Sequence, residues 1–275
     1  MIDRHNGYGG DNAMTIDFTM DRWTKIKENY RLWWAGKLER PIVRVWLSGA
    51  DPKRPEPAVP DYAFDSFYGP SASVEAIIDR WDYKLSMQRF LGDAFPVIWP
   101  NFGPGVLAAF VGACLENGQE TVWFHPPKDQ EIFDRSLTYD AENLWFNHIK
   151  NICRAAVQRW QGLVQIGMTD LGGNLDILAS FRPGEKLLMD LYDYPDDVNR
   201  VLWQTHDLWH RYFDEINAIL QPINPGYSSW ECFFSEEPFY MLQCDFCYMI
   251  SPSMFDKFVR PELVRTCQKL PHSFF

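Results

Sequence analysis

The fold is decided by the stretch LVQIGMTDLGGNLDILASFRPGEKLLMDLYDYPDDVNRVL, residues 163–202. It begins with Leu163–Met168, a short apolar run with β-branched members, which predicts a buried strand. A polar loop with Asp170 and the Gly172-Gly173 pair follows, and glycines there permit close approach by another backbone or a ligand. A helix then starts at Tyr194-Pro195-Asp196-Asp197, because proline and carboxylates suit a helix N-terminus. In α/β proteins such loops at the carboxyl ends of strands carry the chemistry.

Three segments resemble the uroporphyrinogen decarboxylase superfamily. They are Glu39-Arg40-Pro41 leading into a strand over Ile42–Leu47, the LYDYPDDV segment Leu191–Val198, and the ISPSMFDKFVRP segment Ile250–Pro261. Their order and spacing are similar to those of the superfamily. The resemblance implies a (β/α)8 barrel of the TIM type, with its active mouth at the carboxyl ends of the strands. It also implies either corrinoid-linked methyl transfer or decarboxylation of a tetrapyrrole.

Composition narrows the class of protein. The chain of 275 residues fits one barrel domain. We expect this domain over residues 18–275, after a disordered leader at 1–17. The hydrophobic content of 46% and the aromatic content of 16% suit a sizeable core. A net charge of −11 and the lack of a basic cluster argue against nucleic-acid binding. No apolar run approaches the roughly 18 residues of a membrane span. Six cysteines without a secretory signal indicate reduced thiols, hence a cytoplasmic protein. We expect a small-molecule or corrinoid-protein substrate, and a homodimer is compatible with the sequence.

Periodicity predicts the remaining elements. The expected helices are Phe18–Lys37, Ser73–Phe90 with Ser73 as N-cap, Ala141–Trp160, Val198–Leu220 and Ser253–Leu270, and Glu120–Phe124 is expected as an excursion strand. The Pro-rich segment Asp51–Tyr68 is expected to be a lid or specificity loop.

The expected barrel is incomplete at its C-terminus. Barrel strands are expected near Ile42, Val97, Val164, Ser229, Asp245 and Phe274. A TIM barrel needs eight strands, and these are about six. In corrinoid-linked methyltransferases of the superfamily, a His-x-Cys motif and a later Cys bind zinc. The resemblance places that region at His272 or beyond the end of the sequence, so we expect no metal ligands here.

Strand alternation places Arg44 and Trp46 inside the barrel, and Val43, Val45 and Leu47 outside against helices. Arg44 either pairs with a neighbouring carboxylate or clamps a substrate carboxylate or phosphate. The candidate catalytic residues are Asp170 and Asp245, as proton shuttles or as groups that orient the leaving group. Asp170 has a second interpretation, an Asx bond that caps the glycine turn. The candidate substrate-binding residues are Arg44, Trp46, Trp99, Asn101, Asn174, Trp230, Glu231, Gln243 and His272.

Other motifs are interpreted as structural. His206 and His210 share a helix face, but the zincin pattern requires Glu where Asp207 stands, so a solvated or interhelical histidine pair is expected. The CxxC of Cys244 and Cys247 is expected on a strand, where its sulfurs would point to opposite faces and could not share zinc. A redox CxxC would need to open a helix. Asp176 is interpreted as a helix N-cap.

Three functions remain open. The first is methyl transfer, because a tryptophan-rich mouth (Trp46, Trp99, Trp230) suits a methylated amine, an aryl ether or a corrinoid face. The second is decarboxylation of an acidic tetrapyrrole, which would need several cations in the mouth, where only Arg44 is well placed. The third is a degenerate barrel that binds a ligand or partner without turnover.

Overall fold

A computed structural model describes residues 16–127, 133, 136–182 and 185–275 of the chain. The helices are α1 (Met20–Trp34), η1 (Asp65–Tyr68), α2 (Val74–Ser86), α3 (Leu107–Phe110), α4 (Leu144–Trp160), α5 (Asn174–Phe181), α6 (Glu185–Asp193), α7 (Pro195–Leu220), η3 (Asp245–Met249), α8 (Pro252–Phe258) and α9 (Arg260–Lys269). The strands are β1 (Arg44–Ser48), β2 (Gln88–Gly92), β3 (Val97–Ile98), β4 (Cys114–Asn117), β5 (Val122–His125), β6 (Gln165–Ile166), β7 (Phe239–Met241) and β8 (His272–Phe274). The predicted leader at 1–17 lies outside the described residues except for Ile16, which is buried, and Asp17, which bridges to Arg89.

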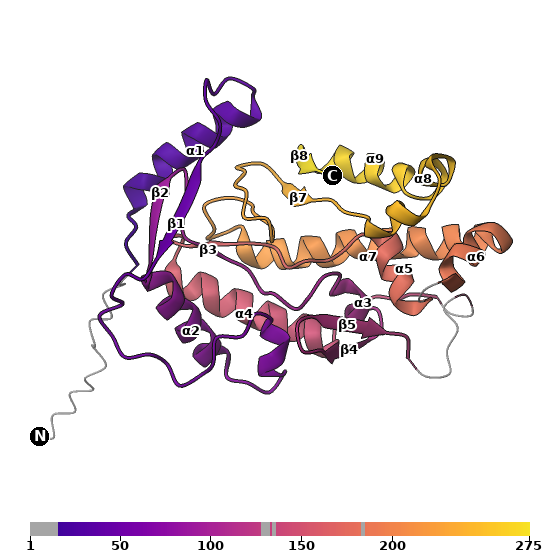
Figure 1. The fold of residues 1–275 in the computed structure, drawn as a ribbon, viewed down its shortest axis with the longest axis horizontal. Coiled ribbons are helices and arrows are strands. Elements are labelled where there is room, and N and C mark those ends of the chain that lie inside the picture. Colours follow the sequence, from indigo (N-terminus) through magenta and orange to yellow (C-terminus); the bar gives the residue numbers. More distant parts are fainter. Residues whose placement is uncertain (1–15, 128–132, 134–135, 183–184) are drawn as a thin grey trace, which may run out of the picture.

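Short parallel strands and long helices alternate along the chain. β3 pairs in parallel with β6, and β7 pairs in parallel with β8. The backbone amide of Met168 donates to the carbonyl of Ser228 at 2.8 Å, which brings the next expected strand beside the end of β6. The long helices α4 and α7 run side by side through the middle of the molecule (Figure 1). Helical connections between parallel strands are typical of βαβ units.

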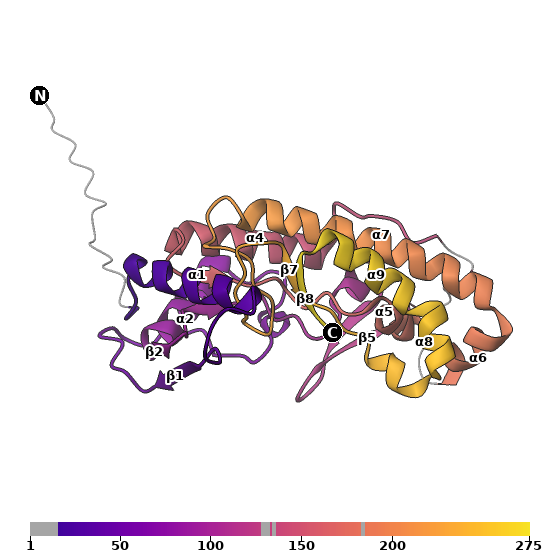
Figure 2. The same cartoon turned by 90° about the horizontal axis from the view of Figure 1, so that it is seen from above.

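The expected eight-stranded barrel type is found only in part. In the described ranges the strands form separate two-stranded sheets, and no closed barrel is present. Figure 2 shows α4 and α7 along one side of the strands, with α9 alongside α7. The architecture is therefore a mixed α/β fold that is consistent with part of a TIM-like barrel.

The expected first barrel strand is wrong. β1 pairs antiparallel with β2, with Val45 opposite Leu91, so it belongs to a separate ribbon. Val45 and Leu47 keep 39% and 48% of their surface exposed, so they do not pack under helices. β2 also ends the preceding helix early, because α2 stops at Ser86 rather than at Phe90. The helical periodicity of the sequence continues into residues 88–92, but these residues form a strand because they pair with β1, which is distant in the sequence.

Several local predictions are confirmed. Ser73 caps α2, since its hydroxyl accepts from the amide of Ala76 at 3.3 Å. The excursion strand exists as β5 and pairs antiparallel with β4. Pro195 lies in the first turn of α7, and Asp196 and Asp197 follow it there. Each of these features depends on residues close together in the sequence.

The C-terminal region differs from the expectation in two places. The expected strand near Asp245 is the short 3₁₀ helix η3, and the strand is β7, slightly earlier in the chain. The single helix expected over Ser253–Leu270 is two helices, α8 and α9, separated at Val259 just before Pro261. Pro261 has no backbone amide to continue the hydrogen bonding of α8, and it lies in the first turn of α9, where a missing donor is tolerated. No helix in the described part of the chain is both long and apolar enough to cross a bilayer.

Candidate active site

The site is built around Asp170, which lies in the loop that follows β6. Its carboxylate oxygen Oδ1 accepts the amide of Gly172 at 3.0 Å and the side-chain amide of Gln243 at 2.5 Å. The first bond is the Asx bond that the sequence offered as an alternative role. Asp170 also accepts the amide of Val106 on its backbone carbonyl at 2.9 Å. Asp170 therefore ties together the loops that follow β3, β6 and β7.

The glycine pair after Asp170 permits these loops to meet. A Cβ added at Gly172 would lie 2.6 Å from the Cα of Gly105, and Gly172 has φ +80°. A Cβ added at Gly173 would lie 2.1 Å from the carbonyl oxygen of Gln243. Only glycine fits such backbone approaches. The close approach predicted from the sequence is thus real, and its partners are the other strand-end loops.

Asp176 connects α5 to η3. Its two carboxylate oxygens accept the backbone amides of Asp245 at 3.0 Å and Phe246 at 2.8 Å. The sequence interpretation of Asp176 as the N-cap of its own helix is wrong, because Gly173 occupies that place. Asp176 instead caps η3, which follows it by about 70 residues. The carboxylate satisfies donors at a helix start that has no side-chain cap of its own.

A pocket of about 690 Å³ opens at these loops. We call it the mouth pocket. Its polar wall is formed by Asp176, Gln243 and Asp245, and its aromatic wall by Trp123, Phe124 and Phe246. Such a volume suits a small organic ligand. The β4–β5 hairpin, α5 and η3 supply most of its lining.

The electrostatics of the site are acidic. Burial raises the pKa of Asp170 to about 6, against the lowering effect of its hydrogen bonds, and the charge of Asp245 adds to the rise. Burial likewise raises the pKa of Asp176 to about 6, and Asp245 again contributes. Two carboxyl groups with pKa values near neutrality beside a third carboxylate are typical of functional sites. The pocket favours a cation over an anion.

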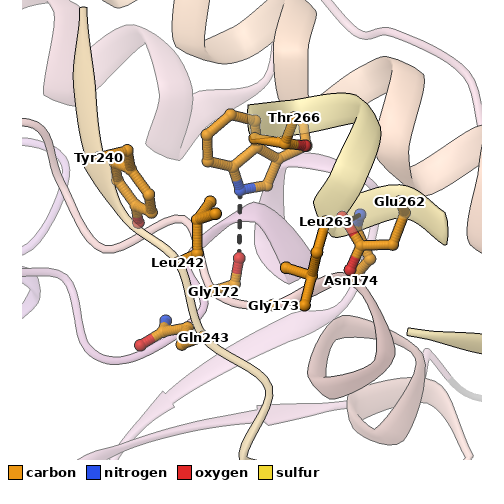
Figure 3. A pocket seen from close by; sticks show the side chains of 10 residues that line it. Gly172, Gly173, Asn174, Tyr240, Leu242, Gln243, Glu262, Leu263 and Thr266 are labelled. Carbon is orange, nitrogen blue, oxygen red and sulfur yellow. Dashed lines mark hydrogen bonds between the residues drawn. The ribbon is translucent and has the colours of Figure 1, made fainter. Parts of the chain in front are cut away.

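Behind the glycine pair lies a second, much smaller cavity of about 10 Å³, drawn in Figure 3. The indole of Trp209, another residue of its lining, donates to the carbonyl of Gly172 at 3.1 Å. Such a cavity holds about one water molecule, so it is too small for a substrate. It supports the back of the site.

Asn174 lies at this rear cavity and not in the mouth pocket (Figure 3). Its side-chain amide donates to Glu262 on α9 at 2.9 Å, and Nδ1 of His206 lies 3.6 Å from the same carboxylate. His210 contacts the hydroxyl of Thr266 at 3.2 Å. The sequence left open whether the pair of His206 and His210 is solvated or interhelical. Both histidines contact α9 and are buried, so the pair is interhelical.

Trp99 and Asn101 line a different pocket, of about 210 Å³, beside η1 and α2. The side-chain amide of Asn101 donates to the carbonyl of Ala63 at 2.8 Å, and its backbone amide donates to Asp65 at 2.7 Å. Burial raises the pKa of Asp65 to about 7. The Pro-rich loop beside this pocket is held to α2 by Arg80, which binds the carbonyls of Val59 and Pro57.

The remaining predicted binding residues are engaged elsewhere. The guanidinium of Arg44 donates to the backbone carbonyls of Glu231 and Cys232, so these hydrogen-bond partners are carbonyl groups and not the neighbouring carboxylate of one expectation. The indole of Trp46 donates to the carbonyl of Phe95 at 3.2 Å. His272 bonds to Ser235 at 2.8 Å and stacks on Trp34.

Trp230 and Glu231 follow the expected strand near Ser229, where no regular strand is present in the described residues. Neither side chain lines the mouth pocket. Of the predicted site residues, the structure thus brings together Asp170, Gln243 and Asp245.

Sequence reasoning missed the aromatic wall. Trp123 and Phe124 belong to the excursion hairpin, which was expected to lie outside the barrel and carried no motif. Its contact with α5 is tertiary, so no local sequence pattern indicates it. The CxxC of Cys244 and Cys247 was expected on a strand but lies at η3. One sequence signal for this was available, the helix start at Ser251-Pro252 that follows it within a few residues.

A metal centre does not fit the described residues. Among them no group of three or more His, Cys, Asp or Glu side chains is arranged to hold an ion. The carboxyl groups at the mouth pocket are used instead as hydrogen-bond acceptors for amides. We therefore derive no step through zinc.

Comparison with known proteins supports the fold. No protein-family model matches the sequence, and no curated protein matches it either. Among solved structures, a methyltransferase from Methanosarcina mazei is similar with a TM-score of 0.54 at 13% sequence identity. The similarity covers 90% of this chain and 68% of that chain. The chain thus shares a fold with that structure, and membership of the uroporphyrinogen decarboxylase superfamily stays a prediction.

Proposed function

We propose that this chain is part of a methyltransferase and that its mouth pocket binds a small methylated ammonium compound. The observation that carries the proposal is the pairing of an acidic wall, Asp176 and Asp245, with an aromatic wall, Trp123, Phe124 and Phe246. Carboxylates attract the positive charge, and aromatic faces bind methylated cations through their quadrupole. The methyltransferase-like fold supports the same reaction class.

The roles of the residues follow from their contacts. Asp245, which is exposed, meets the cationic group, while Asp176 holds η3 in place through the amides of Asp245 and Phe246. Asp170 fixes the side-chain amide of Gln243 at the edge of the pocket. Transfer of a methyl group from a quaternary ammonium leaves a neutral amine, so departure of the amine requires no added proton. The site therefore acts chiefly by binding and orientation.

The methyl acceptor in this proposal is a corrinoid carried by a partner protein, as the sequence resemblance implies. A corrinoid would supply a nucleophilic metal centre for the methyl group. The described residues contain no ligand set for that metal. The part of the reaction assigned to this chain is therefore the binding of the methyl donor.

Tetrapyrrole decarboxylation fits the pocket poorly. A substrate with many carboxylates would need cationic side chains, and the described lining holds Asp176 and Asp245 with no lysine or arginine. Like charges at close range would oppose binding. We therefore do not propose this activity.

Calorimetric titration with tetramethylammonium chloride tests the proposal, with neopentyl alcohol as a neutral probe of similar shape. We expect the cation to bind and the alcohol to bind at least about tenfold more weakly, which corresponds to about 1.4 kcal/mol. Asp245→Asn should weaken cation binding, whereas Asp256→Asn on the exposed face of α8 should leave it unchanged. Equal affinity for the two probes would overturn the assignment.

Turnover is tested separately. The protein is mixed with a trimethylammonium compound and reduced cobalamin, and methylcobalamin is followed by its absorbance. Cation binding without methylcobalamin formation would favour the third hypothesis, a ligand-binding protein without turnover.

A further inference from the structure

The CxxC segment Cys244–Cys247 contributes its two middle residues, Asp245 and Phe246, to the lining of the mouth pocket, and its conformation is one that the sequence did not predict. It opens η3, with Cys244 as the N-cap residue, instead of continuing a strand. The backbone amide of Cys247 donates to the carbonyl of Cys244 at 3.2 Å, which closes a turn between the two cysteines. The objection that this CxxC does not open a helix is therefore removed.

The turn brings the two cysteines within disulfide reach. Residues at the ends of such a hydrogen-bonded turn have Cα atoms less than about 7 Å apart. Disulfides span Cα separations of about 4.4–6.8 Å. The two thiols also interact electrostatically, since Cys247 contributes to the raised pKa of Cys244. On a strand the two side chains would have pointed to opposite faces, and the turn at the start of η3 removes that alternation.

The two thiols differ in access. Cys244 is buried with 5% of its surface exposed, and burial raises the pKa of its thiol, with further contributions from Asp176 and Cys247. Cys247 is only partly buried. A dissolved oxidant thus reaches Cys247 first, and Cys244 is the resolving partner behind it.

We propose that Cys244 and Cys247 form a reversible intramolecular disulfide and act as a redox site that flanks the two residues η3 contributes to the mouth pocket. The oxidant is a small-molecule disulfide. The Cys247 thiolate attacks one sulfur of that disulfide, the S–S bond breaks, and one equivalent of small thiol leaves with a proton.

The Cys244 sulfur then attacks the Cys247 sulfur of the mixed disulfide. The bond to the small sulfur breaks, and the departing thiolate takes up the proton that Cys244 gives up, so a second small thiol leaves. The protein loses two electrons and two protons in total, and one small disulfide becomes two small thiols. Reduction by excess thiol reverses both steps.

The disulfide would act on the pocket through η3. Asp245 and Phe246 stand between the two cysteines, and their amides are the donors that Asp176 accepts. A bond across this turn restrains the backbone that presents both side chains to the pocket. This consequence rests on the proposed function of the pocket, whereas formation of the disulfide does not.

Oxidation of the purified protein with oxidised glutathione tests the proposal. After blocking of free thiols and digestion without reductant, mass spectrometry should find one peptide that contains Cys244 and Cys247 linked, lighter by two hydrogen atoms. Dithiothreitol should restore both thiols. The Cys247→Ser variant should lose this product, and the Cys267→Ser variant, which lacks an exposed cysteine on α9, should retain it.

The outcomes separate this proposal from the proposed function. Glutathione that remains attached to Cys247, or both thiols free under conditions that oxidise a control dithiol peptide, would overturn the disulfide. If the disulfide forms, tetramethylammonium titration of the oxidised and reduced protein then measures its effect on the pocket. We expect at least about a threefold difference in affinity between the two forms. Disulfide formation without cation binding in either form would refute the pocket's assignment alone.

Discussion

Replacing Asp170 by asparagine should remove a specific part of the pH dependence of folding stability. Asp170 is buried with 7% of its surface exposed, and its pKa is raised from 3.8 to about 6 because burial disfavours the charged form. A carboxyl group whose pKa is higher in the folded state binds its proton more tightly there. Its favourable contribution is therefore complete at low pH and is lost as the pH rises through about 6.

The magnitude follows from the two pKa values. The rise from 3.8 to about 6 corresponds to about 3 kcal/mol, at about 1.4 kcal/mol for each pKa unit. The asparagine side chain keeps an oxygen for the amides of Gly172 and Gln243 but cannot ionise. Any hydrogen bond lost by the substitution shifts stability equally at every pH. The difference between wild type and variant therefore isolates the titration.

Urea denaturation followed by circular dichroism, between about pH 4 and pH 8, measures this difference. We expect the stability of the wild type relative to Asp170→Asn to fall by about 2.4 kcal/mol across that range, because the remainder is already lost below pH 4. Asp256→Asn, at an exposed position, serves as the control and should show no such trend. Parallel stability curves for wild type and Asp170→Asn would refute the raised pKa. A relative gain with rising pH would mean that a cation pairs with this carboxylate.

Three further predictions concern stability. Gly173→Ala should destabilise the fold by about 3 kcal/mol or more in urea unfolding, because the new Cβ would lie 2.1 Å from a backbone carbonyl oxygen. Glu262→Ala should cost about 3 kcal/mol, since it removes a buried acceptor, whereas Asp256→Ala breaks only an exposed ion pair and should cost less than about 1 kcal/mol. Burial opposes ionisation of Asp93, but Arg40 and amide donors lower its pKa, so Asp93→Asn should flatten the acid limb of a thermal-stability profile below about pH 4.

The sequence was most informative where the determinants are local. A capping hydroxyl at Ser73, a proline at the start of α7 and a glycine pair after a buried strand each describe the conformation of the next few residues. The same local logic located Asp170 at the end of β6, and it offered the Asx bond that the structure contains. In the structure Gln243 hydrogen-bonds to Asp170, and Asp245 lies on η3 and not on the strand expected there.

Partners far apart in the chain decided the rest. Strand β1 has the alternation of a barrel strand, yet its pairing with β2 places it in an exposed ribbon and turns Arg44 toward two backbone carbonyls. Asp176 fits a helix N-terminus by composition, but its carboxylate caps η3, about 70 residues later.

The sequence by itself determined the alternation of strands and helices, the strand–loop–helix unit at its centre and the acidic character of the chain. These depend on periodicity, turn chemistry and charge, which act over a few residues or over the whole composition. Only the tertiary structure decided which strands pair, which carboxylates meet and where the aromatic wall stands. Burial and long-range hydrogen bonding set those choices, because the cost of an unpaired buried group depends on neighbours that the local sequence does not specify.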